Sequence, residues 1–328
     1  MIVALAGGVG AARMLRGLVA VADPGTVTAV VNTGDDTVMH GLHISPDLDT
    51  VTYTLAGAVH PETGWGLAGE TWSAMEELRA CSGGRLGWFS LGDRDLGTHL
   101  YRTSRLAEGA RLSEVTAEIA ARWGVGVRLL PMTDDRVETR VVLAGAGRPA
   151  DRPVGRAPAG DREVGFQEYF VGLRHDVPVR AVRLAGAQTA KAAPGVLEAL
   201  AGAETVIICP SNPIVSIGPV LATGGIGEAV AARRDAVVAV SPIVAGKALK
   251  GPADRMLSEL GHDASVAGVA RLWAPYASTL VIDEADASLA PSVEAAGMRA
   301  VVTETVMASP ERSAALARTV LRGGRPQR

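Results

Sequence analysis

The sequence of 328 residues is poor in cysteine and aromatic residues, and each shortage excludes a class of protein. Its two cysteines, Cys81 and Cys209, lie far apart, which excludes a disulfide framework and a CxxC metal knuckle. Aromatic residues make up 4% of the chain, so alanine, valine and leucine have to build the core. A net charge of −3 lacks the basic excess of a nucleic-acid-binding protein. Any anionic ligand must therefore be held by local features.

Long hydrophobic runs are also missing. No apolar stretch reaches the length of a membrane span. The opening MIVALAGGVGAARML is apolar, but Arg13 interrupts it, and it lacks the basic n-region and cleavage site of a signal peptide. It therefore predicts a first strand, and we expect a cytoplasmic protein with neither a membrane nor a nucleic-acid partner.

The chain does have a regular alternation of strand and helix patterns. Residues 2–6 are all apolar, a glycine-rich turn then opens a helix, and residues 26–31 predict the next strand. Such a unit predicts parallel strands with a right-handed crossover. The expected class is α/β, a Rossmann-like mostly parallel sheet with helices on both faces. Further strands are predicted at residues 86–91, 125–130, 179–184, 205–209, 236–241, 278–282 and 300–303, and helices at residues 50–59 and 70–80, from Ser113 and after Ser309.

The chain is longer than one hydrophobic core usually supports. The pattern changes midway, where residues 137–143 and 164–173 predict the two strands of a hairpin, separated by a long mobile loop. We expect three parts: residues 1–133, the first part of the Rossmann-like core with the substrate and metal loops; residues 134–178, the β-hairpin insertion; and residues 179–328, the second part of the core, with a helical insertion near residues 217–275.

The turn AGGVGAA, with Gly7, Gly8 and Gly10, follows a strand and opens a helix. In this context backbone amides and the helix dipole hold a phosphate. The turn is not a P-loop, since no Lys-Ser or Lys-Thr follows, and Arg13 occupies the third glycine position of GxGxxG. Asn32 stands where an NAD site needs an acidic residue, which counts against an NAD-dependent oxidoreductase. The alternative is a tight turn without a ligand.

A second loop of small hydrogen-bonding residues follows the strand at residues 205–209. It contains Ser211, Asn212, Pro213 and Ser216. Two such loops at strand ends suggest a nucleotide held between them. Taken singly, this loop is more often structural.

Asp35, Asp36, Asp47 and Asp49 gather beyond the strand at residues 26–31. Clustered carboxylates repel one another unless a cation joins them, and oxygen ligands favour magnesium over zinc. The alternative is that Asp35 and Asp36 cap a helix and Asp47 starts a turn. Further acidic strand ends are predicted at Asp93, Asp95, Asp134 and Asp135, and nearby His40, His43 and His60 are expected to contact ligand or fill space.

The ordered motifs GGVG, NTGDD, GLHISPDLDTVTYTLAG, GWGLAGET, WFSLGDRDLGTH, PMTDD and PSNPIVSIGPVL run over most of the chain. This order resembles the 2-phospho-L-lactate transferase family of coenzyme F(420) biosynthesis. A related gluconeogenesis-factor family of nucleotide-sugar-binding regulators carries a DDGG-Ser-rich stretch where this chain has NTGDD and PDLDT. A non-catalytic regulator is therefore the alternative function.

The resemblance implies a magnesium-dependent transfer of a phosphoenolpyruvyl or 2-phospho-L-lactyl group from a guanosine diphosphate-type donor. The acceptor would be the terminal hydroxyl of 7,8-didemethyl-8-hydroxy-5-deazariboflavin, and GMP would leave. In actinobacterial members the donor looks like the enolpyruvyl compound. The scarcity of lysine in this chain suggests a GC-rich genome such as an actinobacterial one, which favours that donor. A homodimer is expected from the family alone.

The resemblance also assigns roles to residues. Asp36 and Asp49 are expected to hold Mg²⁺ and to orient the attacking hydroxyl. Some relatives carry a lysine at or near Ser90, which leaves that contact open. The donor is expected at Gly7, Gly8, Gly10, Ser211, Asn212, Pro213 and Ser216, and the acceptor at Asn32, Thr33, Asp35, Tyr53, Trp65, Ser90 and Asp93.

Overall fold

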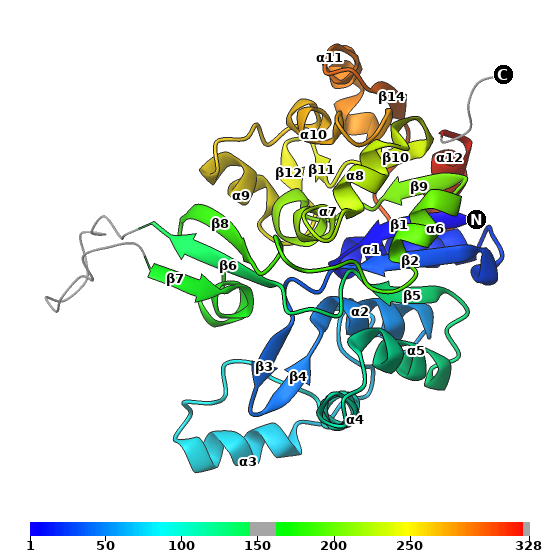
Figure 1. Cartoon of the computed structure of the whole chain (residues 1–328). Coiled ribbons are helices and arrows are strands. Elements are labelled where there is room, and N and C mark those ends of the chain that lie inside the picture. The colour runs from blue at the N-terminus through cyan, green and yellow to red at the C-terminus, as the bar shows by residue number, and fades with distance from the viewer. Residues whose placement is uncertain (145–161, 324–328) are drawn as a thin grey trace, which may run out of the picture.

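The computed structural model describes residues 1–144 and 162–323, and its central feature is a seven-stranded sheet (Figure 1). The strand order is β14-β13-β10-β9-β1-β2-β5, and every neighbouring pair is parallel. The predicted α/β class is therefore confirmed. The strands span Ile2–Ala6 (β1), Val27–Val31 (β2), Arg128–Pro131 (β5), Thr205–Ile208 (β9), Val237–Val240 (β10), Thr279–Ile282 (β13) and Arg299–Val302 (β14).

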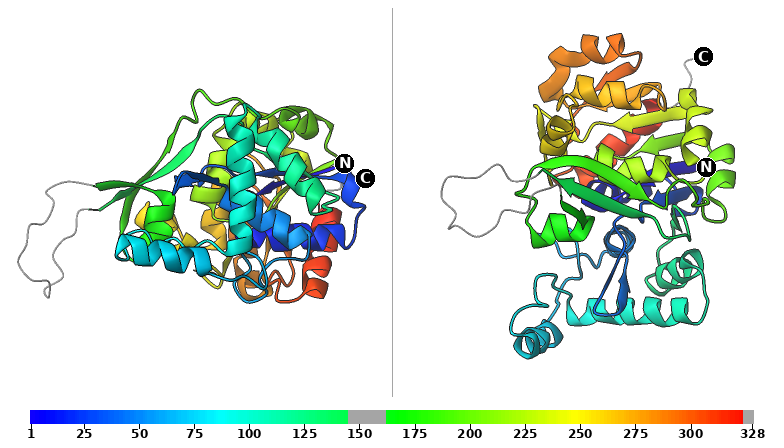
Figure 2. Two further views of the ribbon diagram at one scale, coloured as in Figure 1. Left: turned by 90° about the horizontal axis from the view of Figure 1, so that it is seen from below. Right: turned by 60° about the vertical axis from the view of Figure 1, so that its left-hand side comes forward.

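Helices cover both faces of this sheet (Figures 1 and 2). Alternate side chains of each strand enter two separate cores: Val3 and Leu5 face one, and Ala4 and Ala6 face the other. The face with Ala4 is covered by Gly8–Val19 (α1), Pro46–Leu55 (α2), Leu112–Arg122 (α5) and Pro310–Gly323 (α12). The face with Val3 is covered by Val196–Gly202 (α6), Gly218–Leu221 (α7), Ile226–Ala231 (α8), Ala253–Glu259 (α9), Val266–Trp273 (α10) and Ala290–Ala295 (α11).

Glu138–Leu143 (β6), Arg162–Gly165 (β7) and Val179–Ala185 (β8) form a separate antiparallel sheet, with β6 between the other two strands. The hairpin is thus confirmed, but the prediction that residues 179–184 return to the parallel core is wrong. Within β8 only Val179 is buried, so the strand lacks the two-sided burial of a central parallel strand. The expected mobile loop at residues 144–161 lies almost wholly outside the described residues, and the three-part division of the chain stays a prediction.

The second strand of the hairpin is shorter than predicted. It ends at Gly165, and Glu168–Gly172 forms a short π-helix instead of continuing to residue 173. The aromatic residues that suggested a strand turn inward here: Phe166 stacks on Phe170, and Tyr169 is fully buried. Packing within this small core therefore overrides the strand propensity of the aromatic residues.

A cap projects from the sheet beyond β5 (Figure 1). We define it as the hairpin Thr37–Met39 (β3) and Leu42–Ile44 (β4) with the helices Ser73–Ser82 (α3) and Asp93–Ala107 (α4). The helix α4 was not predicted, and the strand predicted at residues 86–91 is wrong. That segment is a loop of the cap, with Leu86 and Trp88 exposed, and Leu91 packs its side chain on Ile44 and Met75 instead of joining a sheet.

Other helix boundaries shift from their predicted positions. The helix α2 begins at Pro46, in the first turn, where proline is favoured. Arg111, rather than Ser113, caps α5, and Ser113 instead donates its backbone N–H and hydroxyl to Asp134.

None of the helices in residues 1–144 and 162–323 is long and apolar enough to cross a membrane. The remaining elements are Ile243–Val244 (β11), Lys247–Ala248 (β12), a π-helical turn at Pro213–Ile217, and short 3₁₀ turns at Pro24–Thr26, Arg234–Ala236 and Glu284–Leu289.

Replacing Gly10 by alanine is expected to lower the free energy of unfolding by about 1–3 kcal/mol. A Cβ at Gly10 would lie 2.2 Å from the carbonyl oxygen of Pro210, and both groups belong to backbone that cannot easily move. The matched control is Gly97→Ala in α4, where nothing lies within 4 Å of the new Cβ. This change is expected to stabilise the protein by about 0.5–1 kcal/mol. Equal stability of the two variants in urea unfolding would contradict the close approach.

Candidate active site

A cavity of about 840 Å³ opens beyond the carboxyl ends of β1, β2, β9 and β10. This is where open parallel sheets bind ligands, and the volume suits a small-molecule site. Its wall combines the glycine turn before α1, the start of α2, the cap and the loop after β9. Loops that lie far apart in the sequence therefore meet at one place.

Eleven of the residues predicted for the site line this cavity. The structure brings together Gly7, Gly8, Gly10, Asp35, Asp49, Tyr53, Trp65, Ser90, Ser211, Asn212 and Ser216. Five other predicted residues do not line it: Asn32, Thr33, Asp36, Asp93 and Pro213. Of these, Asn32, Thr33 and Pro213 are buried behind the lining residues.

Four carboxylates gather at the acidic side of the cavity, as expected. Asp35, Asp47 and Asp49 are each at most 8% exposed. Burial raises the pKa of Asp35 well above its usual range, and the neighbouring charge of Asp47 raises it further. Burial likewise raises the pKa of Asp36, whose Oδ1 is buried without a partner although Ser45 donates to its Oδ2. So many buried carboxylates fit a bound divalent cation, which would stabilise their charged forms.

Asn32 organises two of these carboxylates from behind. Its side-chain amide donates to Asp47 at 2.9 Å and to Asp35 at 3.3 Å, and its carbonyl oxygen accepts the backbone N–H of Gly34. From the far side, Gln167 donates to Asp35 at 3.1 Å. The amides of Asn32 and Gln167 therefore fix Asp35 in place while leaving it at the cavity wall.

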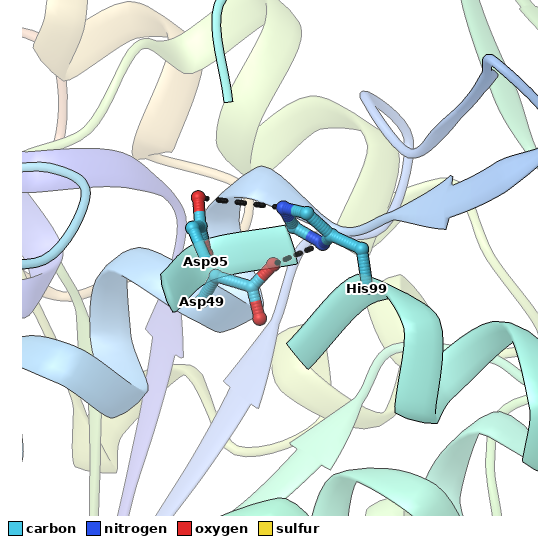
Figure 3. Close-up of side chains that lie close together, drawn as sticks. All are labelled: Asp49, Asp95 and His99. Carbon is cyan, nitrogen blue, oxygen red and sulfur yellow. Dashed lines mark ion pairs between the residues drawn. The ribbon is translucent and has the colours of Figure 1, made fainter. Parts of the chain in front are cut away.

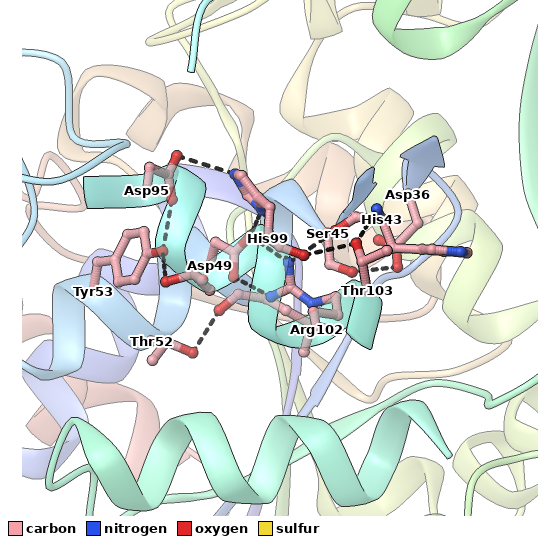
Figure 4. A network of polar contacts seen from close by, with 12 residues as sticks. Asp36, His43, Ser45, Asp49, Thr52, Tyr53, Asp95, His99, Arg102 and Thr103 are labelled. Carbon is pink, nitrogen blue, oxygen red and sulfur yellow. Dashed lines mark hydrogen bonds and ion pairs between the residues drawn. The ribbon is translucent and has the colours of Figure 1, made fainter. Parts of the chain in front are cut away.

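Arg102 of α4 is the buried cation of the site (Figure 4). Its guanidinium donates to both carboxylate oxygens of Asp49, one of them at 3.1 Å. Burial alone would lower the pKa of Arg102, but the charge and hydrogen bonds of Asp49 outweigh this and raise it. The cap is thus joined to α2 by a buried, bidentate ion pair.

Asp49, Asp95 and His99 each place one possible metal-ligand atom within 4.8 Å of the other two (Figure 3). The two nitrogens of His99 face different neighbours, and Nε2 is buried without a hydrogen bond to any residue that the structure describes. Arg102 donates to its Nδ1 at 3.2 Å, so the ring proton sits on Nε2, which faces Asp95 at 3.3 Å. With the Nδ1 lone pair facing Arg102 and the proton on Nε2, this imidazole offers a metal ion no free lone pair, while Asp95 accepts from Tyr53 at 2.6 Å.

The glycine turn and the loop after β9 pack directly against each other. The hydroxyl of Ser211 donates to the carbonyl of Gly7 at 2.7 Å, and a Cβ at Gly7 would lie 2.7 Å from that of Ser216. Gly8 has a φ of 69°, which glycine adopts without strain. Asn212 accepts the backbone N–H groups of Ile214 and Val215 and so caps the π-helical turn.

Of the four further acidic residues expected at strand ends, Asp95 lines the cavity, whereas Asp93, Asp134 and Asp135 lie outside it. Asp93 accepts from Thr71, Ser73 and Ala74 and thereby caps α3. These hydrogen bonds lower its pKa. Asp134 accepts from Ser113, and Asp135 from the backbone of Lys191, so both have structural roles. The histidines at positions 40, 43 and 60 do not line the cavity either.

Several site residues were missed in the sequence. His99 and Arg102 follow Asp95 at helical spacings of four and seven residues, so one face of an amphipathic helix was the available signal. Phe166, Gln167 and Phe170 reach the cavity because the hairpin ends in a π-helix. Arg13 and Lys250 also line the wall, and Lys250 follows the hairpin of β11 and β12.

The sequence matches the model of one protein family, 2-phospho-L-lactate transferase CofD, over residues 2–319. The chain belongs to this family. The family and the names of its relatives identify the chain as a transferase of the phosphoenolpyruvyl or phospholactyl type in coenzyme F(420) biosynthesis.

Three relatives, each named phosphoenolpyruvate transferase, illustrate the match. The Kitasatospora aureofaciens protein is 48% identical over 322 residues, covering 98% of this chain and 96% of that protein. The Streptomyces coelicolor protein is 45% identical over 324 residues (98% and 97%), and the Mycolicibacterium smegmatis protein 41% over 330 residues (98% and 97%). A crystal structure of a Bacillus halodurans protein has a TM-score of 0.59 at 15% identity and covers 98% of both chains, so it shares the fold.

In this CofD family member, metal-free protein is expected to lose stability as the pH rises from about 4 to about 6. Burial raises the pKa of Asp47 from 3.8 to about 6, against the opposing hydrogen bond from Asn32. A carboxyl with a raised folded-state pKa favours folding below its unfolded-state pKa, and this contribution is lost as the pH rises through the folded-state value. The expected loss is on the order of 3 kcal/mol.

The measurement is urea unfolding in the presence of a chelator at several pH values, for the wild type and Asp47→Asn. At each pH the free energy of unfolding of the variant is subtracted from that of the wild type. The difference no longer contains the titration of groups that are independent of Asp47. If this difference in unfolding free energy between wild type and variant stays constant from pH 4 to 7, Asp47 is not held in its neutral form.

Proposed function

We propose that this transferase moves a phosphoenolpyruvyl or 2-phospho-L-lactyl group from a guanosine diphosphate-type donor to 7,8-didemethyl-8-hydroxy-5-deazariboflavin. The terminal hydroxyl of the acceptor forms a bond to the phosphorus that bears the three-carbon acid, the bond to GMP breaks, and (dehydro) coenzyme F(420)-0 results. One observation carries the proposal: a phosphate-type glycine turn and a buried carboxylate group face the same cavity. The names of the relatives favour the enolpyruvyl donor.

The donor nucleotide is assigned to the glycine turn and the loop after β9. The start of α1 offers backbone amides and a helix dipole to phosphate oxygens. Ser211, Asn212 and Ser216 line the cavity beside this turn, whereas Pro213 supports the loop from behind. The contact of Ser211 with Gly7 keeps the two loops in register, which favours one nucleotide held between them.

We assign a magnesium ion to the acidic side of the cavity. Asp35 and Asp49 offer oxygen ligands at the wall, with Asp47 beside them, and Asp36, the other ligand expected from the sequence, supports them from behind. A bound ion supplies charge neutralisation for the phosphate oxygens. The chain's own carboxylates also accept hydrogen bonds, so they can orient the attacking hydroxyl and take up its proton.

The acceptor is assigned to the side of the cavity formed by the cap and the loop at residues 60–66. Trp65 is 53% exposed and offers a face on which a flat ring system can stack. Arg79 donates to Ser90 at 2.5 Å and so positions its hydroxyl at the wall. Tyr53 contributes through its hydrogen bond to Asp95, while Asn32, Thr33 and Asp93 hold the surrounding backbone.

The decisive experiment incubates purified protein, Mg²⁺ and the deazaflavin alcohol with separately prepared lactyl and enolpyruvyl guanosine diphosphates. GMP release and product mass are followed, and the ratio of the two rates names the donor. No GMP from either donor, with folded protein, would overturn the proposal and favour a nucleotide-sugar-binding regulator. Light scattering of the same sample would test the homodimer, and fractionation of cells the cytoplasmic location, both of which we propose from the resemblance.

A further inference from the structure

Two cations line the cavity without a carboxylate partner. Arg13 of α1 makes no ion pair or hydrogen bond with any residue in the described parts of the chain. Lys250 makes one such contact there, a hydrogen bond from its Nζ to the carbonyl of Thr63 at 2.7 Å. Arg102, which lies behind the acidic wall, is instead paired with Asp49.

The two cations lie beside the glycine turn. Arg13 is five residues beyond Gly8 on α1, and both line the same cavity. The Nζ of Lys250 is 3.6 Å from the position of a Cβ at Gly64, and that position is 2.9 Å from the side chain of Val9. Lys250 therefore lies near the start of α1.

The two positive charges also influence each other. Burial lowers the pKa of Lys250, and the charge of Arg13 lowers it further. Two like charges held close together in a partly buried place repel each other unless an anion lies between them. The chain has an acidic side to the same cavity, but its carboxylates are engaged by Arg102, Asn32 and Gln167 instead.

The sequence around Arg13 supports a ligand role. Dinucleotide-binding turns carry a third glycine where this chain has Arg13, because that glycine allows close helix–strand packing. Here the position carries a guanidinium that lines the cavity. A planar cation with several N–H donors is well suited to phosphate oxygens.

We propose that Arg13 and Lys250 form an anion subsite that binds the diphosphate of the nucleotide donor. The inference rests on the proposed function for the identity of the donor. The subsite complements the amides of the glycine turn, so that the diphosphate is held by backbone on one side and by two cations on the other. The hydrogen bond of Lys250 to Thr63 places the same residue next to the loop that carries Trp65, so one side chain adjoins both substrate regions.

The test is isothermal titration of GDP into full-length protein with Mg²⁺ present. Arg13→Gln and Lys250→Gln are each expected to raise the Kd for GDP by about tenfold to 100-fold, since each removes a charge-assisted hydrogen bond. Arg13→Lys is expected to recover part of the loss because it keeps the charge. The matched control is Lys247→Gln, which removes an exposed lysine of β12 that does not line the cavity and is expected to leave the Kd unchanged.

Two results would overturn the subsite. One is an unchanged Kd for GDP in both variants, with thermal unfolding showing that they are folded. The other is that the variants bind GDP normally, but phosphoenolpyruvate no longer competes with GDP as it does in the wild type. This result would assign the two cations to the three-carbon acid. Because the titration needs no turnover, a wild type that binds GDP through Arg13 but releases no GMP would refute the proposed function and keep the subsite. If the wild type releases GMP while both variants bind GDP normally, the proposed function stands and the subsite is refuted.

Discussion

Replacing Arg102 by methionine is expected to lower the free energy of unfolding by about 3–5 kcal/mol, the largest loss of stability predicted for a single change in this protein. The substitution keeps a long side chain in place but removes the buried guanidinium that pairs with Asp49. Asp49 would then be buried without a counter-charge, close to three further carboxylates. Chemical unfolding followed by circular dichroism measures the effect.

The matched control lies one turn further along α4. Arg105 also pairs with carboxylates, here Glu108 and Glu118, but at the protein surface, so Arg105→Met is expected to have a much smaller effect. A double variant, Arg102→Met with Asp49→Leu, is expected to regain part of the stability, since an apolar pair can replace a buried ion pair. If Arg102→Met and Arg105→Met were equally mild, the buried pair would not hold the cap to α2.

Replacing Asp35 by asparagine is expected to reduce the transferase rate by at least about 100-fold while making the metal-free protein more stable. Asp35 lines the cavity as a proposed magnesium ligand. Its pKa is raised by burial and by the charge of Asp47, so a neutral side chain removes a repulsion that the folded state now bears. Gln167, which donates to Asp35, can turn its amide to accept from the new side chain.

A different pair of effects is expected for the control variant Asp134→Asn, namely lower stability and unchanged turnover. This carboxylate accepts from the backbone and hydroxyl of Ser113 at the start of α5 and lies outside the cavity. Asparagine has one oxygen in place of two and can keep only one of these hydrogen bonds in the same geometry, so the change should cost about 1 kcal/mol of stability and leave turnover unchanged. GMP release and urea unfolding on the two variants together test the assignment. An active Asp35→Asn variant would remove Asp35 from the site.

The parallel sheet could be predicted because its central strands are apolar and buried on both faces. Runs such as residues 205–208 leave no alternative to a central strand, and the loops that follow them had to meet at one edge. The cap could not be predicted in the same way. Its loop at residues 86–91 is as apolar as a strand, but the small cluster of Ile44, Met75 and Leu91 takes up its apolar side chains.

The candidate site was predictable as far as it is local in sequence. NTGDD and PDLD supplied the carboxylates: NTGDD follows β2, and PDLD begins α2 shortly after it. Which carboxylate faces the cavity depends on a single peptide turn: Asp35 lies at the wall, and Asp36 turns toward Ser45. Arg102 comes from a helix more than fifty residues away from Asp49, so only the tertiary structure could join them.

The cap has a consequence for how this family can diversify. It contributes Trp88 and Ser90 to the cavity, yet its own apolar cluster contains only three buried side chains. The glycine turn, in contrast, is built into the close contact of α1 with the loop after β9. Mutations in the cap therefore disturb little packing, whereas mutations in the glycine turn, the proposed nucleotide site, meet close backbone contacts. A lineage can acquire a new acceptor by drift in the cap as long as Arg102 keeps its carboxylate partner.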